Sequence, residues 1–318
     1  MLRSILLTGG AGFIGSALAR HLLASESLER LVILDKLAPT GNAGNLIGPD
    51  QDPRFHFTAG DISDRSLVAR LLSEHDVTGI FNLAVETDPD RSAESSAELL
   101  ATNVNGIASL LEVSRAARVP LLQCSTDDVH GSIAPPDRSS ELSPLRPTTA
   151  YAASKAAADL LCQAATRSHA QDIVITRATT TYGPRQHHAE LIPTLVRRAL
   201  RDEPLALEGS GMCIRDWIHV DDHCRGLLSA FTKGAPGALY YFGGQCERTN
   251  LGLARDVLRI LSKPESLLSF APERPGHDQR HAVDCNQALG KLRWQPEVKF
   301  QSAFPSVVRE LAANLSAS

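Results

Sequence analysis

The stretch Thr8-Gly9-Gly10-Ala11-Gly12-Phe13-Ile14-Gly15 decides the fold. It follows a short apolar run at residues 5–7 and leads into a helix that we expect at residues 17–25. A glycine turn in this position lets the backbone approach a pyrophosphate, and the start of the helix offers free N–H groups and the positive end of its dipole. Glycine turns are common, so the pattern alone is weak, and a simple tight turn is the alternative.

An acidic residue accompanies the turn, because Asp35 ends a second apolar run at residues 31–34. Its carboxylate can bind both hydroxyls of a ribose and would repel a 2′-phosphate. We therefore predict a dinucleotide site that holds NAD, although Lys36 slightly weakens the preference for NAD over NADP. Asp61 and Ile62 stand where a third strand should end, and we expect them to contact the adenine. A simple loop aspartate is the alternative reading of Asp61.

Strand-like and helix-like segments alternate through the first half of the chain. Strands are expected at residues 5–7, 31–34, 55–57, 79–83, 121–124 and 173–176, and helices at 17–25, 66–74, 103–117 and 151–168. This alternation predicts an α/β protein with a Rossmann-type, doubly wound parallel sheet. After residue 178 prolines break the pattern, which indicates a smaller C-terminal α/β substrate lobe. We expect an NAD-binding Rossmann domain at 1–177 and the lobe at 178–318, with 239–243 considered as a strand returning to the main sheet.

Composition excludes several classes of protein. The 318 residues are 43% hydrophobic and 21% charged with a net charge of −4, which is ordinary for a globular enzyme. No basic block suggests nucleic acid, and no apolar run approaches the roughly 18 residues that span a bilayer. The six cysteines form no C-x-x-C pair, so we expect neither a metal site nor a disulfide framework, and free thiols fit a cytoplasmic protein.

Two further patterns carry acid–base chemistry. Tyr151 and Lys155 are four residues apart on one face of an expected helix. The ammonium and the positive ring of a bound nicotinamide should lower the pKa of Tyr151, which could then deprotonate a sugar hydroxyl. Thr126, Asp127 and Asp128 follow a strand end, where Thr126 could bind the reacting oxygen and the two carboxyls could divide the roles of acid and base. The alternatives are a surface pair on the helix and an N-cap or solvated turn.

Longer motifs make the sequence resemble a known family. They include Arg215-Asp216-Trp217-Ile218, Glu247-Arg248 with Asn250, and Arg274-Pro275-Gly276-His277-Asp278. With the glycine turn and the Tyr151–Lys155 pair, they resemble the extended short-chain dehydrogenases/reductases, and among these the dTDP-glucose 4,6-dehydratases. The resemblance runs over nearly the whole chain.

The resemblance implies an NAD-dependent nucleotide-sugar 4,6-dehydratase, which is a lyase. Tyr151, held by Lys155, would deprotonate the sugar O4 while NAD takes the C4 hydride. Asp128 would remove the C5 proton, Asp127 would protonate the leaving 6-hydroxyl, and the hydride would return to C6. The product would be a nucleotide-linked 4-keto-6-deoxy sugar.

The family's binding residues carry over position by position. The resemblance implies cofactor contacts from Gly9, Gly12, Phe13, Ile14, Gly15, Asp35, Lys36, Asp61, Ile62, Leu83, Ala84, Asn103, Ser125, Tyr151 and Lys155. It implies substrate contacts from Glu86, Thr87, Thr181, Leu191, Leu207, Glu208, Arg215, Tyr241, Asn250, Arg274 and His277, with Arg215 and Arg274 on the diphosphate. The expected substrate is a dTDP- or UDP-linked hexose. A homodimer through residues 103–117 and 151–168 is expected as well.

Several departures from the family lie on the substrate side. The usual Thr-Asp-Glu reads Thr-Asp-Asp here, so the base Asp128 is one methylene shorter, and a misplacement of about 1 Å can cost on the order of 100-fold in rate. His130 stands where the family has tyrosine, Glu208 where it often has tyrosine, and Tyr241 where it has asparagine. Segments 84–90 and 180–188 are more polar than in the family. These changes suggest a non-standard sugar or base with the hydride chemistry kept.

Two other functions remain open on the sequence alone. An NAD-dependent nucleotide-sugar 4-epimerase or 5,6-dehydratase would share the C4 oxidation, although the pair Asp127-Asp128 argues against a plain epimerase. A non-catalytic NAD-binding sensor or scaffold would share the fold, although the retained Tyr151 and Lys155 argue against it.

Overall fold

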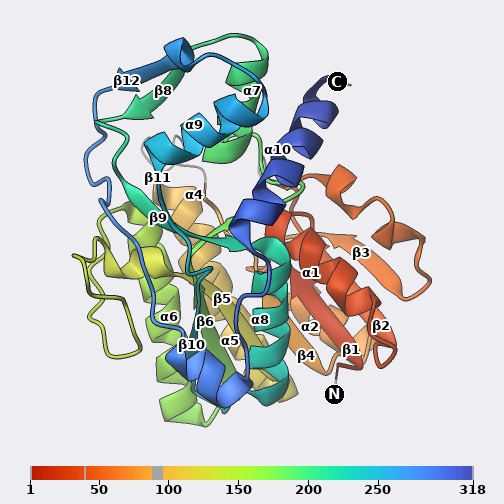
Figure 1. Cartoon of the computed structure of the whole chain (residues 1–318). Coiled ribbons are helices and arrows are strands. Elements are labelled where there is room, and N and C mark those ends of the chain that lie inside the picture. Colours follow the sequence, from red (N-terminus) through yellow and green to blue (C-terminus); the bar gives the residue numbers. More distant parts are fainter. Residues whose placement is uncertain (1, 39–40, 88–95, 317–318) are drawn as a thin grey trace.

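Seven strands pair in parallel to form one sheet in the order β10-β6-β5-β4-β1-β2-β3. This computed structural model describes residues 2–38, 41–87 and 96–316 (Figure 1). The strands are β1 (Ser4–Thr8), β2 (Arg30–Asp35), β3 (Phe55–Ala59), β4 (Gly79–Asn82), β5 (Leu121–Thr126), β6 (Ile173–Ala178) and β10 (Leu239–Phe242). The order 3-2-1-4-5-6 is that of the Rossmann fold, so the predicted sheet is confirmed.

Helices cover both faces of this sheet because the strand side chains alternate between them. Ile5 and Leu7 of β1 pack with α1 (Phe13–Leu23) and α8 (Val220–Lys233) on one face. Leu6 packs on the other face with α2 (Arg65–Glu74), α5 (Ile107–Ala117) and α6 (Ala150–His169). β1, between the two apolar layers, is fully buried, whereas the edge strand β3 is partly exposed.

Two helix bounds differ from those predicted. The helix α1 begins at Phe13 rather than residue 17, directly after Gly12 as its N-cap, and it ends at Leu23. The expected helix at 103–117 becomes α5 only from Ile107, because residues Ala101–Gly106 form a π-helical segment after α4 (Ser96–Leu100). In the ranges that the structure describes, no helix is long and apolar enough to cross a bilayer.

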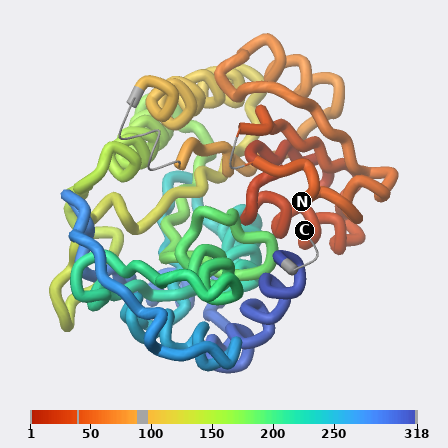
Figure 2. The backbone as a smooth tube through the Cα atoms, turned by 90° about the horizontal axis from the view of Figure 1, so that it is seen from above, coloured from red at the N-terminus to blue at the C-terminus, as the bar shows by residue number. Residues whose placement is uncertain are grey.

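A third apolar cluster lies above the carboxyl ends of the strands. It is built around Tyr182, Trp217 and Phe304, and in the view from above its elements lie together on one side of the N-terminal strands (Figure 2). We call it the upper lobe. Its elements and the strands that join it to the sheet are β7 (Thr180–Tyr182), α7 (Leu191–Leu200), β8 (Leu205–Glu208), β9 (Ile214–His219), β11 (Glu247–Thr249), α9 (Asn250–Ile260), β12 (Leu268–Ala271) and α10 (Phe300–Ser316).

The chain enters and leaves this lobe more than once. After β9 it returns to the sheet as α8 and then as β10, whose residues pair with β6 from Leu239 opposite Ile175 to Phe242 opposite Ala178. The expected return of residues 239–243 to the main sheet is thus observed for residues 239–242. Helix α8, which precedes them, also packs against this sheet. The division at residues 177 and 178 stays a prediction.

Candidate active site

The glycine turn after β1 is shaped for close backbone approach. Gly9 has a φ of +67°, and a Cβ there would lie 2.5 Å from the carbonyl oxygen of Leu83. A Cβ on Gly15 would lie 2.1 Å from the carbonyl oxygen of Gly9. Gly12 caps α1 with no side-chain hydrogen bond, so the N–H groups of Phe13 and Ile14 have no side-chain acceptor. These features fit a pyrophosphate at the start of α1.

The carboxylate of Asp35 is fixed beside this turn. One oxygen accepts a hydrogen bond from the backbone N–H of Ala11 at 2.9 Å, and the other from that of Leu37 at 2.8 Å. Lys36 turns away from Asp35, since its Nζ donates to Thr102 Oγ1 at 2.7 Å. Asp35 therefore meets a ribose without a lysine to neutralise it, which favours NAD over NADP.

The expected adenine residues differ in exposure. Asp61 is partly exposed and accepts from the backbone N–H of Ser63 at 2.8 Å. Ile62 is only 3% exposed and packs in the core with α2 and α5. The side chain of Asp61 is thus available to a nucleotide, whereas that of Ile62 supports the loop from below.

Several other expected cofactor residues hold loops in place through their own hydrogen bonds. The N–H of Ala84 donates to Thr8 Oγ1 at 3.2 Å. Buried Asn103 accepts from the N–H of Glu86 at 2.8 Å and donates to its carbonyl at 3.0 Å. Ser125 Oγ donates to Asp159 at 3.0 Å. The side chains of Asn103 and Ser125 therefore serve the fold, which leaves their backbone to the cofactor. Thr87 is partly buried, and residues 88–90 lie outside the described ranges.

Tyr151 and Lys155 stand on the first turns of α6, which Thr149 caps by accepting from the N–H of Ala152. Lys155 Nζ donates to the carbonyl of Cys124 at 2.7 Å. Burial raises the pKa of Tyr151 well above its ordinary value, and the negative charge of Asp128 raises it further. The lowering of this pKa that is expected from Lys155 and a bound nicotinamide concerns the cofactor-bound protein and stays a prediction.

The segment after β5 gives two adjacent carboxyls, those of Asp127 and Asp128, different surroundings. Thr126 Oγ1 accepts from the N–H of Asp128 at 3.2 Å, so Thr126 does form the N-cap named as the alternative. Asp127 is 3% exposed, and its buried Oδ2 has no hydrogen-bond partner among the described residues. Burial raises the pKa of Asp127 to about 7. A carboxyl that keeps its proton closer to neutral pH than usual suits a general acid.

Asp128 has the opposite shift because of a residue that the sequence did not single out. His281, 4% exposed, places Nδ1 3.0 Å from Asp128 and Nε2 3.1 Å from Asp278. Burial opposes ionisation of Asp128, yet the contact and charge of His281 hold its pKa below the ordinary value. The same contacts raise the pKa of His281 to about 10, against the effect of its burial. Asp128 is therefore ionised and can act as a base, and the protonated His281 stabilises its negative charge.

The predicted diphosphate residues occupy the rim of the upper lobe. Arg215 is partly exposed on β9, and its guanidinium donates to the carbonyl of Ile214 at 2.9 Å. The Arg274 guanidinium lies 3.2 Å from Glu208 Oε2, and His277 Nδ1 lies 3.0 Å from the same oxygen. Glu208 thus faces Arg274, which is expected at the diphosphate, and His277, an expected substrate contact, instead of standing free for a base.

Four other expected substrate residues lie on the upper lobe or beside it. Leu191 begins α7 and Asn250 begins α9, both partly exposed. Thr181 lies 3.0 Å from the ring of His223. Leu207 is 2% exposed in the core of the lobe, so its side chain cannot meet a substrate, which corrects the prediction.

Comparison with known proteins agrees with this geometry. Residues 5–243 match the model of the NAD dependent epimerase/dehydratase family. A dTDP-glucose 4,6-dehydratase of Actinoplanes sp. is 40% identical over 320 residues, 98% of each chain. The chain belongs to the NAD-dependent epimerase/dehydratase family. The predicted resemblance and NAD as the cofactor are thereby confirmed.

Solved structures of the family superpose closely on the chain. The dTDP-glucose 4,6-dehydratase of Streptomyces venezuelae, solved with NAD and TDP bound, has a TM-score of 0.95 at 38% identity over 99% of this chain and 98% of its own. A UDP-glucose 4-epimerase of Thermotoga maritima has a TM-score of 0.90 at 26% identity over 98% of this chain and 99% of its own. Dehydratases and epimerases of the family therefore share this fold, and the site must distinguish them.

The departure at Tyr241 has a structural cause unrelated to substrate. Tyr241 is fully buried on β10. Its hydroxyl lies 2.6 Å from His130 Nε2, accepts from Arg177 at 2.7 Å and donates to the carbonyl of Ser140 at 3.1 Å. The expectation that Tyr241 binds the substrate was wrong. Two of the three positions named as departures from the family, 130 and 241, therefore contact each other.

Proposed function

We propose that the chain is an NAD-dependent nucleotide-sugar 4,6-dehydratase, a lyase that forms a nucleotide-linked 4-keto-6-deoxy sugar. The observation that carries the proposal is the pair Asp127 and Asp128, adjacent carboxyls with opposite pKa shifts beside Tyr151. A 4-epimerase needs only C4 oxidation and its reversal, so it gains nothing from such a pair. Elimination of water needs both an acid and a base.

The roles of the residues follow from their protonation states. NAD, when bound, supplies the acceptor of the C4 hydride and the donor that returns it to C6. Tyr151 takes the proton of the sugar O4. Asp128, ionised beside His281, takes the C5 proton that the new 4-keto group has acidified. When the hydride is added at C6, Asp128 gives a proton to C5, and exchange of that proton with solvent brings deuterium to this carbon. Asp127, whose pKa burial raises to about 7, gives its proton to the 6-hydroxyl as the C6–O bond breaks and water leaves.

The residues on the rim suit a nucleoside diphosphate. Arg215 and Arg274 offer planar guanidinium groups that can bind phosphate oxygens in pairs. Arg274 would have to exchange Glu208 for the phosphates, and its side chain, 56% exposed, is free to turn. We expect a dTDP- or UDP-linked hexose, because dTDP-glucose 4,6-dehydratases share nearly the full length of the chain at 38–40% identity and a UDP-glucose 4-epimerase does so at 26%.

The reaction is tested by mass spectrometry of dTDP-glucose and UDP-glucose after incubation with the protein in deuterated water. We expect a product that lacks one water and carries solvent deuterium at C5. Asp128→Asn should stop deuterium entry at C5 yet still allow reduction of the nicotinamide, seen by its absorbance. Tyr151→Phe should stop both. An unchanged mass with an inverted C4 would make the protein an epimerase, and unchanged sugars with retained NAD would make it a sensor or scaffold.

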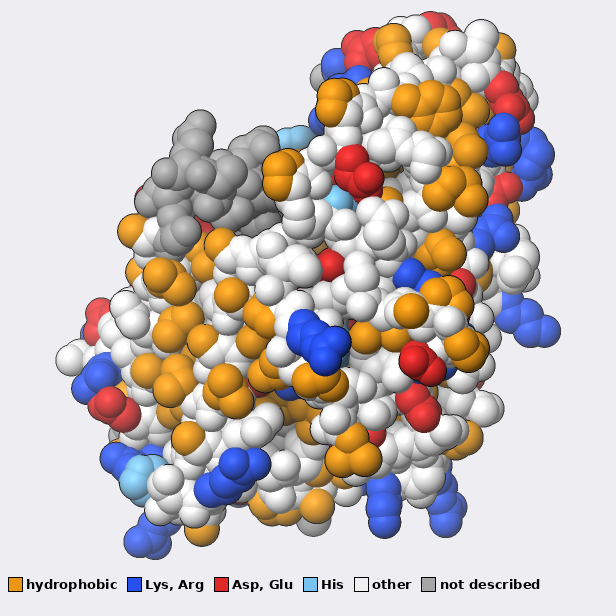
Figure 3. Space-filling view, turned by 90° about the vertical axis from the view of Figure 1, so that its left-hand side faces the viewer, with side chains coloured by type: hydrophobic (Ala, Val, Ile, Leu, Met, Phe, Trp, Pro, Cys, Tyr) orange, Lys and Arg blue, Asp and Glu red, His pale blue; other side chains and the backbone are white. Residues whose placement is uncertain are grey.

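We also propose that two copies of the chain associate through α5 and α6. Leu160 on α6 is 53% exposed, and apolar side chains gather over parts of the face on which α6 lies (Figure 3). The alanine-rich sequence of α6 allows close approach of a second helix. Sedimentation of wild type and Leu160→Glu tests this, since a dimer through α6 should dissociate in the variant. A wild-type monomer would refute it.

A further inference from the structure

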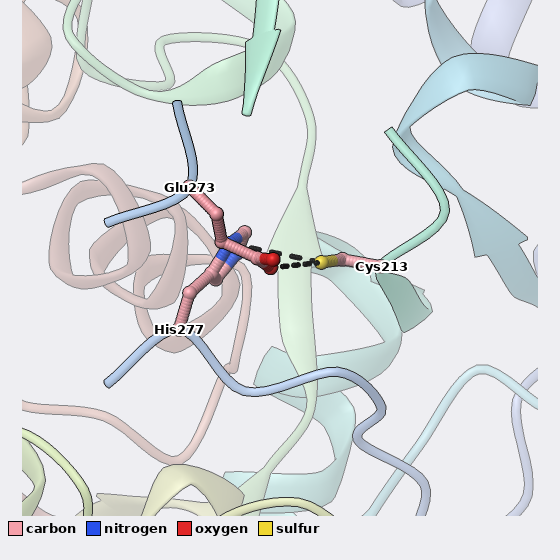
Figure 4. A group of neighbouring side chains, drawn as sticks. All are labelled: Cys213, Glu273 and His277. Atoms are coloured by element: carbon pink, nitrogen blue, oxygen red, sulfur yellow. Dashed lines mark hydrogen bonds and ion pairs between the residues drawn. The ribbon is translucent and has the colours of Figure 1, made fainter. Parts of the chain in front are cut away.

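Three side chains that can bind a metal converge at the edge of the upper lobe. Cys213 stands just before β9, and Glu273 and His277 come from the loop after β12 (Figure 4). The sulfur lies 3.6 Å from Glu273 Oε1 and 3.6 Å from His277 Nδ1, and those two atoms are 3.5 Å apart. Thiol, carboxylate and imidazole thus form a nearly equilateral triangle of donor atoms.

The size of the triangle matches one face of a tetrahedron around zinc. Zinc binds sulfur at about 2.3 Å and nitrogen or oxygen at about 2.0–2.2 Å, so neighbouring ligands of a tetrahedral site lie about 3.3–3.6 Å apart. The observed separations between the three donor atoms would need almost no adjustment to accommodate a zinc ion. They are also long for direct hydrogen bonds between the carboxylate and the imidazole.

A second observation points into the same place. Glu208 Oε2 is buried and has no aligned hydrogen bond among the described residues, and it lies 3.0 Å from His277 Nδ1 and 3.2 Å from the Arg274 guanidinium. Gln279 donates to Glu273 Oε1 at 2.6 Å and so orients the carboxylate from outside the triangle. Glu273 and His277 also line a cavity of about 510 Å³, which gives an ion access from the surface. The cluster therefore has three donors, an orienting partner and a second carboxylate, that of Glu208, next to it.

We propose that Cys213, Glu273 and His277 bind a zinc ion, with water or Glu208 as the fourth ligand. One sulfur, one nitrogen and one oxygen suit zinc, whereas calcium and magnesium prefer oxygen alone. As the Zn–S bond forms, the Cys213 thiol releases its proton to solvent. A second group, Asp127, Asp128 and His281, also lies within ligand distance, but there the imidazole already serves as the cation between carboxylates.

The ion would fix a loop on which the catalytic groups depend. Glu273 precedes Arg274, and His277 precedes Asp278, which holds His281 against Asp128. Zinc would tie this loop to β9, which carries Arg215. Its role would be to position these residues, without taking part in bond breaking.

The proposal is tested on the full-length protein by treating it with a chelator, then titrating it with zinc ions in a calorimeter. We expect one ion per chain. Replacement by cobalt should give a thiolate-to-metal charge-transfer band, which requires a cysteine ligand and does not depend on any reaction of the protein. Cys213→Ser should abolish the band and weaken binding by more than the roughly 10–100-fold that loss of an outer partner costs.

Two further variants complete the test. Cys246→Ser changes another partly buried free cysteine outside the cluster and should leave both readings unchanged. Glu273→Gln alters an exposed side chain, so it should fold even if the Cys213 variant does not, and it should weaken zinc binding. The proposal is overturned if the wild type binds no zinc, or if zinc binds as tightly to the Cys213 and Glu273 variants and cobalt gives no thiolate band.

Discussion

Replacing His281 by glutamine should shift both limbs of the pH–rate profile upward. In the wild type the rate should fall at low pH as Asp128 gains a proton, and above about pH 7 as Asp127 loses the proton it must donate. The charge of His281 lowers the pKa of both carboxyls. Glutamine removes that charge but keeps a hydrogen-bond donor, so both pKa values should rise.

The size of the shift follows from the contact between His281 and Asp128, at 3.0 Å. Unit charges about 4 Å apart are worth about 1 kcal/mol in water and about 4 kcal/mol at an effective dielectric constant near 20. The side chain of Asp128 is 35% exposed, so we take a value near the lower limit. About 1.4 kcal/mol corresponds to one pKa unit, so the acid limb should move up by about one pH unit.

The assay is the initial rate of water loss, measured by mass spectrometry across the pH range at constant ionic strength. His56→Gln, on the exposed strand β3, serves as the control and should keep the wild-type profile. The variant should lose rate at low pH yet retain a larger share of its maximum above pH 7 than the wild type does. A profile that falls in height without moving either limb would show that His281 only supports the fold.

Three further predictions concern other parts of the molecule. Tyr151→Phe should lower kcat by about 100-fold or more with NAD still bound, measured by turnover and cofactor content. Gly15→Ala should destabilise the protein by about 1–3 kcal/mol and lower its Tm by several degrees, because its Cβ would lie 2.1 Å from the Gly9 carbonyl oxygen. Gly290→Ala is the control, because no atom of the described residues lies within 4 Å of the added Cβ, and it should leave the Tm unchanged or raise it. Equal changes of Tm in the two variants would refute the argument. Tyr241→Phe should lower the free energy of unfolding in denaturant by about 1–3 kcal/mol, because the groups around the hydroxyl lose their partner, and it should leave KM unchanged. A raised KM with no loss of stability would show that Tyr241 contacts the substrate after all.

Local requirements made the cofactor side predictable from sequence. The glycine turn and Asp35 lie within one strand–helix–strand unit, where spacing along the chain sets spacing in space. Only glycine tolerates the φ of Gly9 and the approach of its Cβ position to Leu83, so the pattern itself reports the geometry. The closeness of Asp127 and Asp128 could be predicted as well, because both directly follow one strand, whereas their separate roles came from the resemblance and stay a prediction.

Contacts between distant segments were the part that sequence could not supply. His281 lies three residues beyond the recognised Arg274–Asp278 motif, and its partner Asp128 lies in the short helical turn after β5. Tyr241 was misassigned because the pairing of β10 with β6, which places it opposite Arg177, cannot be read from residues near it. Cys213 and Glu273 are 60 positions apart, so no zinc spacing was visible.

The late arrival of β10 affects how the chain can be made. Residues 179–238 are synthesised between β6 and the strand that pairs with it. Until β10 leaves the ribosome, β6 presents a row of unpaired N–H and C=O groups, the kind of edge that recruits other chains. A fragment cut after residue 177 would keep that open edge permanently. The second half of the chain thus protects the first half from aggregation, quite apart from anything it binds.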